Sequence, residues 1–220
     1  MKVIELNKVA TASNDRDAAV LREELKARDL FLINLMSAAG SGKTTLLSRT
    51  IQDLKGQVPI GVMEADIASD VDAAAIERLG ARSIQVHTGG CCHMDAAMTR
   101  ASLDAFDAGE TRIVFLENVG NLICPAEFDT GAHRKVMILS VPEGDDKPLK
   151  YPLVFKESSI ALLNKVDILP YCNFDMKSAK EDILALHPGM EVVEVSCTTG
   201  QGIDEWCRWL KARVAEKRRG

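Results

Sequence analysis

Short apolar runs alternate with stretches of helical periodicity along most of the chain. Such runs are typical of strands that are buried on both faces of a parallel sheet. We expect seven strands, at Leu30–Met36, Ile60–Glu64, Ser83–His87, Arg112–Glu117, Val136–Val141, Ile160–Asn164 and Val192–Ser196. Because strands and helical patterns alternate, the sequence predicts an α/β fold: a mainly parallel sheet with helices on both faces.

Helical patterns fill most of the gaps between these strands. The predicted helices are Thr44–Leu54, Val71–Leu79, Met94–Phe106, Ser178–Leu186 and Ile203–Lys217. The stretch Gly144–Pro148 is predicted to be a surface turn or loop.

The segment before the first strand has a different character. Ala18–Ala27 is a charged helical stretch, for which Asn14 or Asp15 could supply the N-cap. Because this helix precedes the first strand, residues 1–28 are interpreted as an N-terminal helical appendage that packs outside the sheet. Residues 29–220 are expected to form one domain, which the length of the chain allows.

Composition and charge exclude several classes of protein. The net charge is -5 and no long basic run is present, so a nucleic-acid partner is not expected. No apolar run reaches the roughly 18 residues that span a bilayer, and no signal pattern opens the chain, so we expect a cytoplasmic protein without a membrane partner. Its six cysteines should then be reduced thiols, and a cluster among them would suggest metal or redox chemistry.

A glycine-rich loop follows the first predicted strand. Residues 37–45 match the G-x-x-x-x-G-K-[ST] motif, except that Ser37 replaces the first glycine. Glycines let backbone N–H groups turn toward a phosphate, and the helix that follows points its positive end at the anion. We expect Lys43 to reach the β- and γ-phosphates and Thr44 to ligate Mg²⁺. The predicted phosphate-binding residues are Ala39, Gly40, Ser41, Gly42, Lys43, Thr44 and Thr45.

A second motif predicts which base is bound. Ile160–Asp167 delivers Asn-Lys-x-Asp at the carboxyl end of a strand, where open α/β sheets bind ligands. The Asp167 carboxylate can accept from guanine N1–H and N2–H₂, a match that adenine cannot make. Asn164 can bond N7 and brace the loop, the Lys165 stem can cover the base, and Ser196 can pack on its edge. The two motifs together predict a P-loop GTPase that binds Mg·GTP.

Acidic residues at two strand ends are expected near the Mg²⁺ ion. Glu117 ends a strand, and Gly120, three residues later, can offer its N–H to the γ-phosphate. Asp66 follows another strand and is predicted to ligate Mg²⁺ or to orient the attacking water; the alternative for both acids is a solvated side chain. Catalysis is assigned to Lys43 and Asp66. Turnover should be slow, because no glutamine stands where Ras-like proteins orient their water.

Three residues form a predicted transition-metal site. Cys92 and His93 are adjacent, and Cys124 lies seven residues beyond Glu117. Thiolate and imidazole are preferred ligands of Zn²⁺ and Ni²⁺. The alternative is that these cysteines are ordinary structural thiols, and whether Cys91 is also a ligand stays open.

With these motifs the sequence resembles the HypB family, the hydrogenase nickel-incorporation GTPases of the SIMIBI class. The resemblance rests on Asn34–Ser37 running into Gly40–Leu47, Cys92–Ala96, Glu117–Leu122, Asp146–Pro152 and Asn164–Asp167. The stretch Asp146–Pro152 is the most specific, because no general GTPase chemistry requires it. Ala39 stands where the family usually has proline and Ala65 where it usually has glycine. The second change bears on the placement of Asp66.

The resemblance implies a GTPase that delivers nickel during [NiFe]-hydrogenase maturation. Cys92, His93 and Cys124 would bind Ni²⁺, with Zn²⁺ as an alternative occupant. The implied partners are GTP and GDP, a second copy of the chain in a GTP-dependent homodimer, hydrogenase maturation proteins and the hydrogenase large subunit. Nickel storage is not expected, because the chain lacks the N-terminal cysteine motif and the His-rich tract of some members.

Two alternatives remain open at this stage. One is a nickel GTPase that serves urease, although that group usually carries Cys-Pro-His and this chain has Cys92-His93. The other is a regulatory or assembly GTPase that binds no transition metal. A metal-binding measurement separates the second alternative from both nickel hypotheses.

Overall fold

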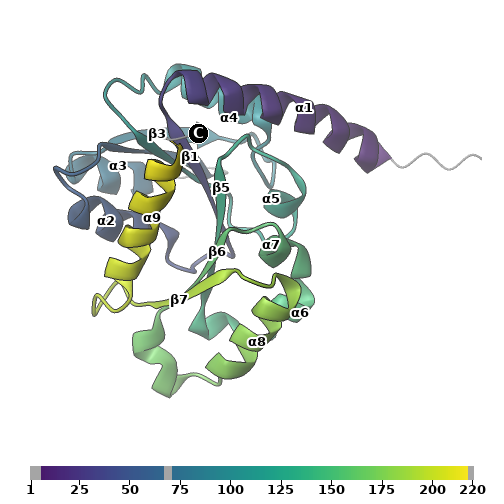
Figure 1. The fold of residues 1–220 in the computed structure, drawn as a ribbon, viewed down its shortest axis with the longest axis vertical. Helices are drawn as coiled ribbons and strands as arrows, with labels where there is room; N and C mark the ends of the chain where they lie inside the picture. The colour runs from purple at the N-terminus through teal and green to yellow at the C-terminus, as the bar shows by residue number, and fades with distance from the viewer. Residues whose placement is uncertain (1–5, 67–70, 218–220) are drawn as a thin grey trace, which may run out of the picture.

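The fold is a single seven-stranded sheet covered by helices on both faces (Figure 1). The computed structural model describes residues 6–66 and 71–217. The strands are β1 (Phe31–Ser37), β2 (Ile60–Asp66), β3 (Arg82–His87), β4 (Ile113–Glu117), β5 (Arg134–Ser140), β6 (Ile160–Asn164) and β7 (Glu191–Val195). All six pairings are parallel, in the order β3-β2-β4-β1-β5-β6-β7. The predicted fold class and all seven strands are confirmed.

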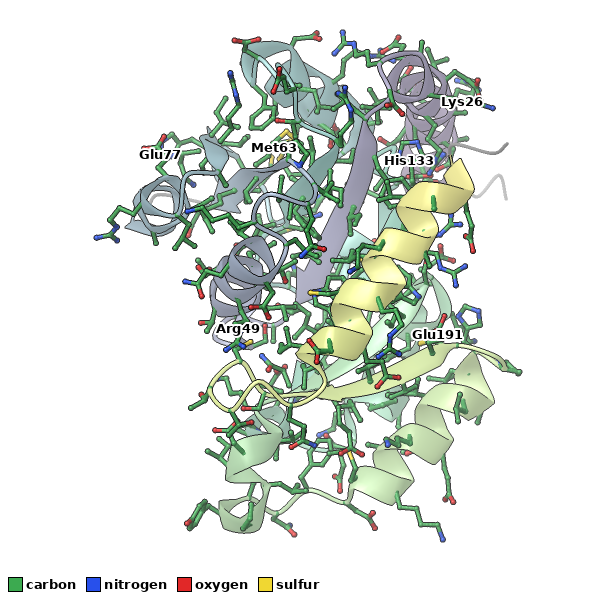
Figure 2. All side chains as sticks on the ribbon, turned by 60° about the vertical axis from the view of Figure 1, so that its left-hand side comes forward. Lys26, Arg49, Met63, Glu77, His133 and Glu191 are labelled. Atoms are coloured by element: carbon green, nitrogen blue, oxygen red, sulfur yellow. The ribbon has the colours of Figure 1, made fainter. Side chains whose placement is uncertain are left out.

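Alternating residues of the strands build two separate apolar layers. On β1, Phe31, Ile33 and Leu35 face the layer formed by α2 (Lys43–Asp53), α3 (Val71–Arg78) and α9 (Ile203–Lys217). Figure 2 shows α9 crossing this face of the sheet, with Arg49 of α2 and Glu191 of β7 on either side of it. At the centre of this layer Trp206 is buried, and its Nε1 donates to Thr50 Oγ1 at 2.9 Å.

The other face is covered by α1 (Leu6–Ala27), α4 (Ala96–Ala105), α5 (Cys124–Glu127), α7 (Pro152–Lys156) and α8 (Met176–Leu186). Figure 1 shows α1 and α4 side by side on this face. Leu21 and Leu25 of α1 are buried in the core beneath it. No helix in the described part of the chain is long and apolar enough to cross a membrane.

The beginning of α1 corrects the sequence prediction. The helix begins by Leu6, so Asn14 lies inside it and is not its N-cap. Asn14 instead uses its side chain for tertiary contacts: Nδ2 donates to the Asp129 carbonyl at 2.8 Å, and Oδ1 accepts from Ala96 N at 2.9 Å. The sequence pattern could not distinguish a helix-capping role for Asn14 from that of a buried side chain with tertiary contacts. The division at residue 28 stays a prediction.

The stretch Gly144–Pro148 is only partly a loop. A 3-10 turn, η1 (Val141–Glu143), precedes it, and the short helix α6 (Lys147–Lys150) begins inside it. Pro148 fits there because the first turn of a helix needs no N–H donor from proline. A second 3-10 segment, η2 (Val166–Tyr171), follows β6.

The strand order places the carboxyl end of β1 at the centre of the sheet. The chain crosses from β1 toward β2 and β4 on one side and continues to β5 on the other. Such a switch point is where open α/β sheets bind ligands. Both the phosphate loop and the loop after β4 leave the sheet at this edge.

Candidate functional site

The phosphate loop between β1 and α2 has the backbone that its glycines allow. Gly40 has φ 74° and Gly42 has φ 98°, conformations that side chains with a Cβ rarely adopt. An added Cβ on Gly42 would lie 2.7 Å from Asn164 Nδ2, so space as well as conformation requires glycine there. The loop opens directly into α2, whose N-terminus is thereby presented to an anion.

Ser37 does more than the small residue expected from the motif. Its hydroxyl lies 3.0 Å from Lys43 Nζ and 2.6 Å from Ser41 Oγ, all in the buried floor of the loop. The hydroxyl therefore gives Lys43 a polar partner inside the loop. A glycine at this position could not supply that partner.

The base-reading motif is joined to the phosphate loop by direct hydrogen bonds. Asn164 Nδ2 donates to the Ser41 carbonyl at 2.9 Å, and Lys165 Nζ donates to the Gly40 carbonyl at 2.7 Å. Lys165 adopts φ 62°, and its N–H is held by Asn164 Oδ1 at 2.8 Å. The two motifs thus contact each other directly, which supports the bracing role predicted for Asn164.

Asp167, the residue predicted to read guanine, is oriented by the loop after β7. Ser196 is fully buried, and its Oγ donates to Asp167 Oδ1 at 2.6 Å. The same Oγ accepts from Thr199 N at 3.1 Å, so the loop holds the hydroxyl in place. The structure therefore places Ser196 beside the Asp167 carboxylate, a contact that the sequence did not predict, and its packing on the guanine edge stays a prediction.

The predicted Mg²⁺ residues meet in a cleft of about 570 Å³ next to the phosphate loop. Thr44 Oγ1 donates to Glu117 Oε1 at 2.9 Å, and Asp66 at the end of β2 lines the same cleft. These donors are all hard oxygens, the ligand type that Mg²⁺ prefers, so the residues present fit this ion.

One acid of this cleft was missed. Glu64 lines it, is 3% exposed and pairs in register with Glu117 across β2 and β4. The sequence could have indicated this residue, because Glu64 is an acid within an otherwise apolar run and carboxylates are rarely buried unless they are paired. Glu64 thus joins Glu117 and Asp66 as a third carboxylate at this edge of the sheet.

Gly120 packs directly on the phosphate loop. A Cβ at this position would lie 2.9 Å from Ala39 Cα, so only glycine permits the approach. The segment after β4 is therefore in contact with the loop that should hold the phosphates. This placement supports the predicted role of the Gly120 N–H.

The predicted metal ligands come together at the start of α5. The ligand atoms of Cys92, His93 and Cys124 all lie within 4.8 Å of one another. Cys92 Sγ is 2.9 Å from Cys124 Sγ and 3.7 Å from His93 Nδ1. The His93 ring stacks on Phe128, with centroids 4.0 Å apart, which limits its orientation. Residues 32 positions apart in sequence thus form one compact donor set.

The two pKa shifts at this cluster act in opposite directions on cation binding. The hydrogen bond with Cys124 is the main cause that raises the pKa of the Cys92 thiol, so a metal must displace its proton. Burial lowers the pKa of the His93 imidazole, against the opposing effect of Asp95 and Glu127. The neutral ring is the form that binds metals. The half-buried Cys197 and the buried Cys207 differ, since burial raises the pKa of each to about 11 and so favours the neutral, unreactive thiol.

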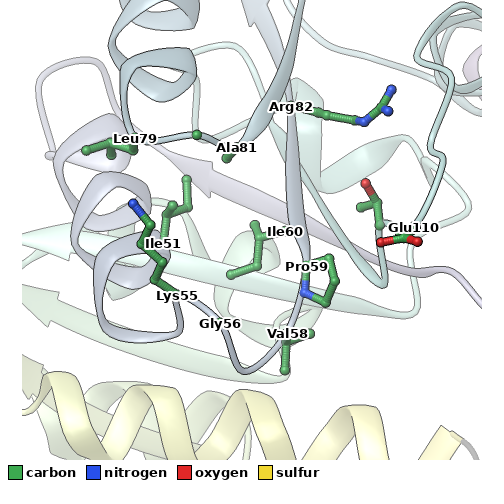
Figure 3. A pocket seen from close by; sticks show the side chains of 12 residues that line it. Ile51, Lys55, Gly56, Val58, Pro59, Ile60, Leu79, Ala81, Arg82 and Glu110 are labelled. Carbon is green, nitrogen blue, oxygen red and sulfur yellow. The ribbon is translucent and has the colours of Figure 1, made fainter.

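A second cavity, of about 330 Å³, lies at the opposite edge of the sheet (Figure 3). Ile51, Ile60 and Leu79 supply its apolar wall, and Arg82 and Glu110 are charged residues of its margin. None of its lining residues belongs to the motifs described above. The cleft at the phosphate loop is therefore the candidate site.

Comparison with known proteins decides the family. The model of the CobW/HypB/UreG nucleotide-binding domain matches residues 31–194. The chain belongs to this family. The HypB family lies within it, and the predicted resemblance is thereby confirmed.

Relatives within the CobW/HypB/UreG family support a HypB-type chain. The hydrogenase maturation factor HypB of Escherichia coli (strain K12) is 44% identical over 212 residues, which are 96% of this chain and 73% of that protein. The crystal structure of HypB from Helicobacter pylori in complex with nickel has a TM-score of 0.88 at 34% identity, covering 93% and 96% of the two chains. HypB from Archaeoglobus fulgidus has a TM-score of 0.86 at 36% identity, covering 92% and 99%.

Proposed function

We propose that the protein is a GTP-hydrolysing metallochaperone that delivers nickel during [NiFe]-hydrogenase maturation. The observation that carries the proposal is one loop shared by two sites. The end of β4 and the segment that follows it contribute Glu117 and Gly120 to the nucleotide cleft and Cys124 to the thiol–imidazole cluster. The HypB relatives, one of them solved with nickel, support this reading.

The nucleotide chemistry follows from the positions of the side chains. Lys43 and the backbone N–H groups of the loop neutralise the phosphate charge, and Asp167 selects guanine. Thr44, Glu117 and Asp66 would hold Mg²⁺, which supplies positive charge to the β- and γ-phosphates. Asp66 is the residue proposed to orient the attacking water. With no Ras-type glutamine, turnover should be slow.

The metal chemistry requires a further ligand. Cys92, His93 and Cys124 supply three donors, which leaves a four-coordinate ion one short. A second copy of the chain can complete the shell if two clusters face each other across a two-fold axis. Exposed apolar side chains favour this arrangement. Ile123, which directly precedes Cys124, is 52% exposed, Leu153 of α7, a helix that contacts α5, is 40% exposed, and Leu149 of the adjoining α6 is 64% exposed.

Nucleotide state is proposed to control nickel affinity. The γ-phosphate would order the segment that includes Gly120, and Cys124 lies on the same segment. The coupling is reciprocal, so nickel must change GTP affinity by the same factor. Hydrolysis would then release nickel to the hydrogenase large subunit or to another maturation protein.

The first experiment is an equilibrium titration of the reduced protein with Ni²⁺, with GDP and then with a non-hydrolysable GTP analogue. We expect different affinities in the two states, and we expect Cys92→Ala and Cys124→Ala to abolish binding in both. Cys172→Ala is the matched control, because this half-buried thiol lies outside the cluster. Nickel binding that survives both cluster substitutions would overturn the assignment of the site.

A urease-directed nickel GTPase is the second candidate, because the matched family model spans both groups. This alternative predicts the same Ni²⁺ titration result, but it predicts a different protein as the acceptor of nickel. Transfer of ⁶³Ni from the loaded protein to purified hydrogenase large subunit, but not to apo-urease, is expected under the primary proposal. Transfer to urease alone would favour the alternative.

A further inference from the structure

A fully buried side chain, Asn118, lies between the nucleotide cleft and the metal cluster. It directly follows Glu117 at the end of β4 and also lines the cleft. Its Oδ1 accepts from Met94 N at 3.2 Å and from Val119 N at 2.9 Å. One oxygen thus joins the segment after β4 to the segment that carries the metal ligands before α4.

The other half of the Asn118 amide is anchored in the centre of the sheet. Nδ2 donates to Asn34 Oδ1 at 3.1 Å, and Asn34 is fully buried in β1, three residues before Ser37. The Asn118 main chain is held as well, because its N–H donates to the Leu35 carbonyl at 3.1 Å. The amide therefore has a defined orientation, with its oxygen directed at Met94.

The contacts form a continuous path between the two sites. Thr44 Oγ1, the predicted Mg²⁺ ligand, bonds Glu117; Glu117 is joined through one peptide bond to Asn118. Asn118 bonds the N–H of Met94, and Met94 directly follows the ligand His93. Cys124 lies on the same segment as Glu117 and Gly120, whereas Cys92 and His93 belong to a different segment. The Asn118–Met94 hydrogen bond is a direct connection from the nucleotide segment to that second segment.

The hydrogen bond can transmit a movement because it is buried. Met94 is fully buried, so water cannot easily replace a lost partner of its N–H. A buried N–H left without an acceptor is costly, so Met94 should follow any displacement of Asn118. Since Asn118 is bonded covalently to Glu117, a change at the Mg²⁺ and γ-phosphate site would move both metal segments together.

We propose that Asn118 is the positioning residue that couples nucleotide state to metal affinity, by linking the Glu117–Gly120 segment to the Cys92–His93 segment. The inference rests on the proposed function and deepens it. Asn118 touches no metal, so its role lies in the difference between two nucleotide states and not in metal affinity as such.

Asn14 of α1 offers a matched control. Like Asn118, it is a buried amide whose oxygen accepts a backbone N–H just after the metal ligands, here that of Ala96 at 2.9 Å. Its Nδ2 holds the carbonyl of Asp129, beyond Cys124. Asn14 thus braces both ligand segments, but from a helix that contributes no residue to the nucleotide cleft.

The test repeats the Ni²⁺ titration on the full chain, with GDP and with the GTP analogue, for wild type, Asn118→Ala and Asn14→Ala. We expect the wild-type affinities to differ at least about fivefold, the lower range of measured couplings. Asn118→Ala should bring this ratio to within about twofold of one. Asn14→Ala should weaken nickel binding in both states and keep the wild-type ratio.

Each result has a separate meaning. A wild-type ratio that persists in Asn118→Ala overturns the role of Asn118 and leaves the proposed function intact. Wild-type nickel binding without nucleotide dependence overturns the coupling but keeps the metal site. An absence of nickel binding in the wild type removes the proposed function and this inference with it.

A second measurement needs no substitution, in case Asn118→Ala does not fold. Hydrogen exchange of the Met94 and Val119 amides in the wild-type protein should change together between the GDP and GTP-analogue states. The Ala96 amide, which Asn14 holds, should change less. Equal protection of Met94 in both states would overturn the proposal.

Discussion

Single side chains of the base site owe their function to neighbours that lie far away in sequence. Asp167 carries the chemistry that should read guanine, but Ser196, 29 residues later, holds its carboxylate at 2.6 Å. The Asn164 amide and the Lys165 ammonium group donate hydrogen bonds to the backbone of the phosphate loop. Guanine recognition is therefore proposed to depend on Asp167 alone for direct contact with N1–H and N2–H₂, with the other residues keeping it in position.

Asp167→Asn should exchange the preferred base. The amide replaces one carboxylate oxygen by a donor, which opposes the guanine N2–H₂ group and matches the O2 carbonyl of xanthine. Two charged hydrogen bonds are at stake, so GTP affinity should fall about 100-fold or more. Binding of fluorescent GTP and XTP measures this.

Glu181→Gln is the control for the Asp167 substitution. It makes the same acid-to-amide change on the exposed surface of α8 and should leave both affinities unchanged. Unchanged GTP binding in Asp167→Asn would mean that another residue reads the base.

At the scale of elements, α1 is integrated into the domain through both apolar and polar contacts. Leu21 and Leu25 fill the core beneath α1 and α4, and Asn14 bonds the segments on either side of the metal cluster. Arg22 adds a hydrogen bond from Nε to the Ala132 carbonyl at 3.1 Å. These contacts predict that α1 stabilises the fold.

Leu25→Ala should therefore be strongly destabilising. The side chain is fully buried, and truncation of a buried leucine costs about 2–5 kcal/mol. Val20→Ala on the same helix is the control, because Val20 is 53% exposed and should change stability by about 0.5 kcal/mol or less. Urea denaturation of both variants gives the comparison. An equally small effect of the two substitutions would favour a dispensable appendage.

At the scale of the whole molecule, the cleft at the phosphate loop and the thiol–imidazole cluster lie at the same edge of one sheet. The exposed side chains of Ile123, Leu149 and Leu153 come from neighbouring elements, since α7 contacts both α5 and α6. An apolar surface beside a proposed metal site that supplies only three ligands suits a second copy of the chain.

Leu149→Glu is expected to prevent the proposed homodimer. A carboxylate buried in an apolar interface should weaken association at least about tenfold, because an unpaired charge must be desolvated. Sedimentation velocity with the GTP analogue should show dimers for the wild type and monomers for this variant. The Val20→Glu variant, changed on the exposed face of α1, should still dimerise. Dimerisation of Leu149→Glu would place the interface elsewhere.

Much of this protein follows from local sequence alone. Strands such as Ile160–Asn164 are apolar throughout because both faces are buried, and this pattern is visible without a structure. The phosphate loop and the Asn-Lys-x-Asp motif are each a continuous stretch of sequence, and their glycines and polar groups fit the predicted nucleotide. The sequence by itself therefore determined the fold class, the phosphate-loop and Asn-Lys-x-Asp motifs, and which three residues meet in the thiol–imidazole cluster.

The tertiary structure decided those roles that require contact between residues far apart in sequence. The roles of Asn14 and Glu64, and the Asn118–Met94 hydrogen bond, are set by neighbouring strands and by a helix packed across the sheet. The sequence alone does not show whether a polar residue caps a helix, faces water or forms a hydrogen bond with a buried amide. Packing in the tertiary structure excludes water from some of these side chains and places a hydrogen-bond partner beside them. These two effects determine the role of such a residue.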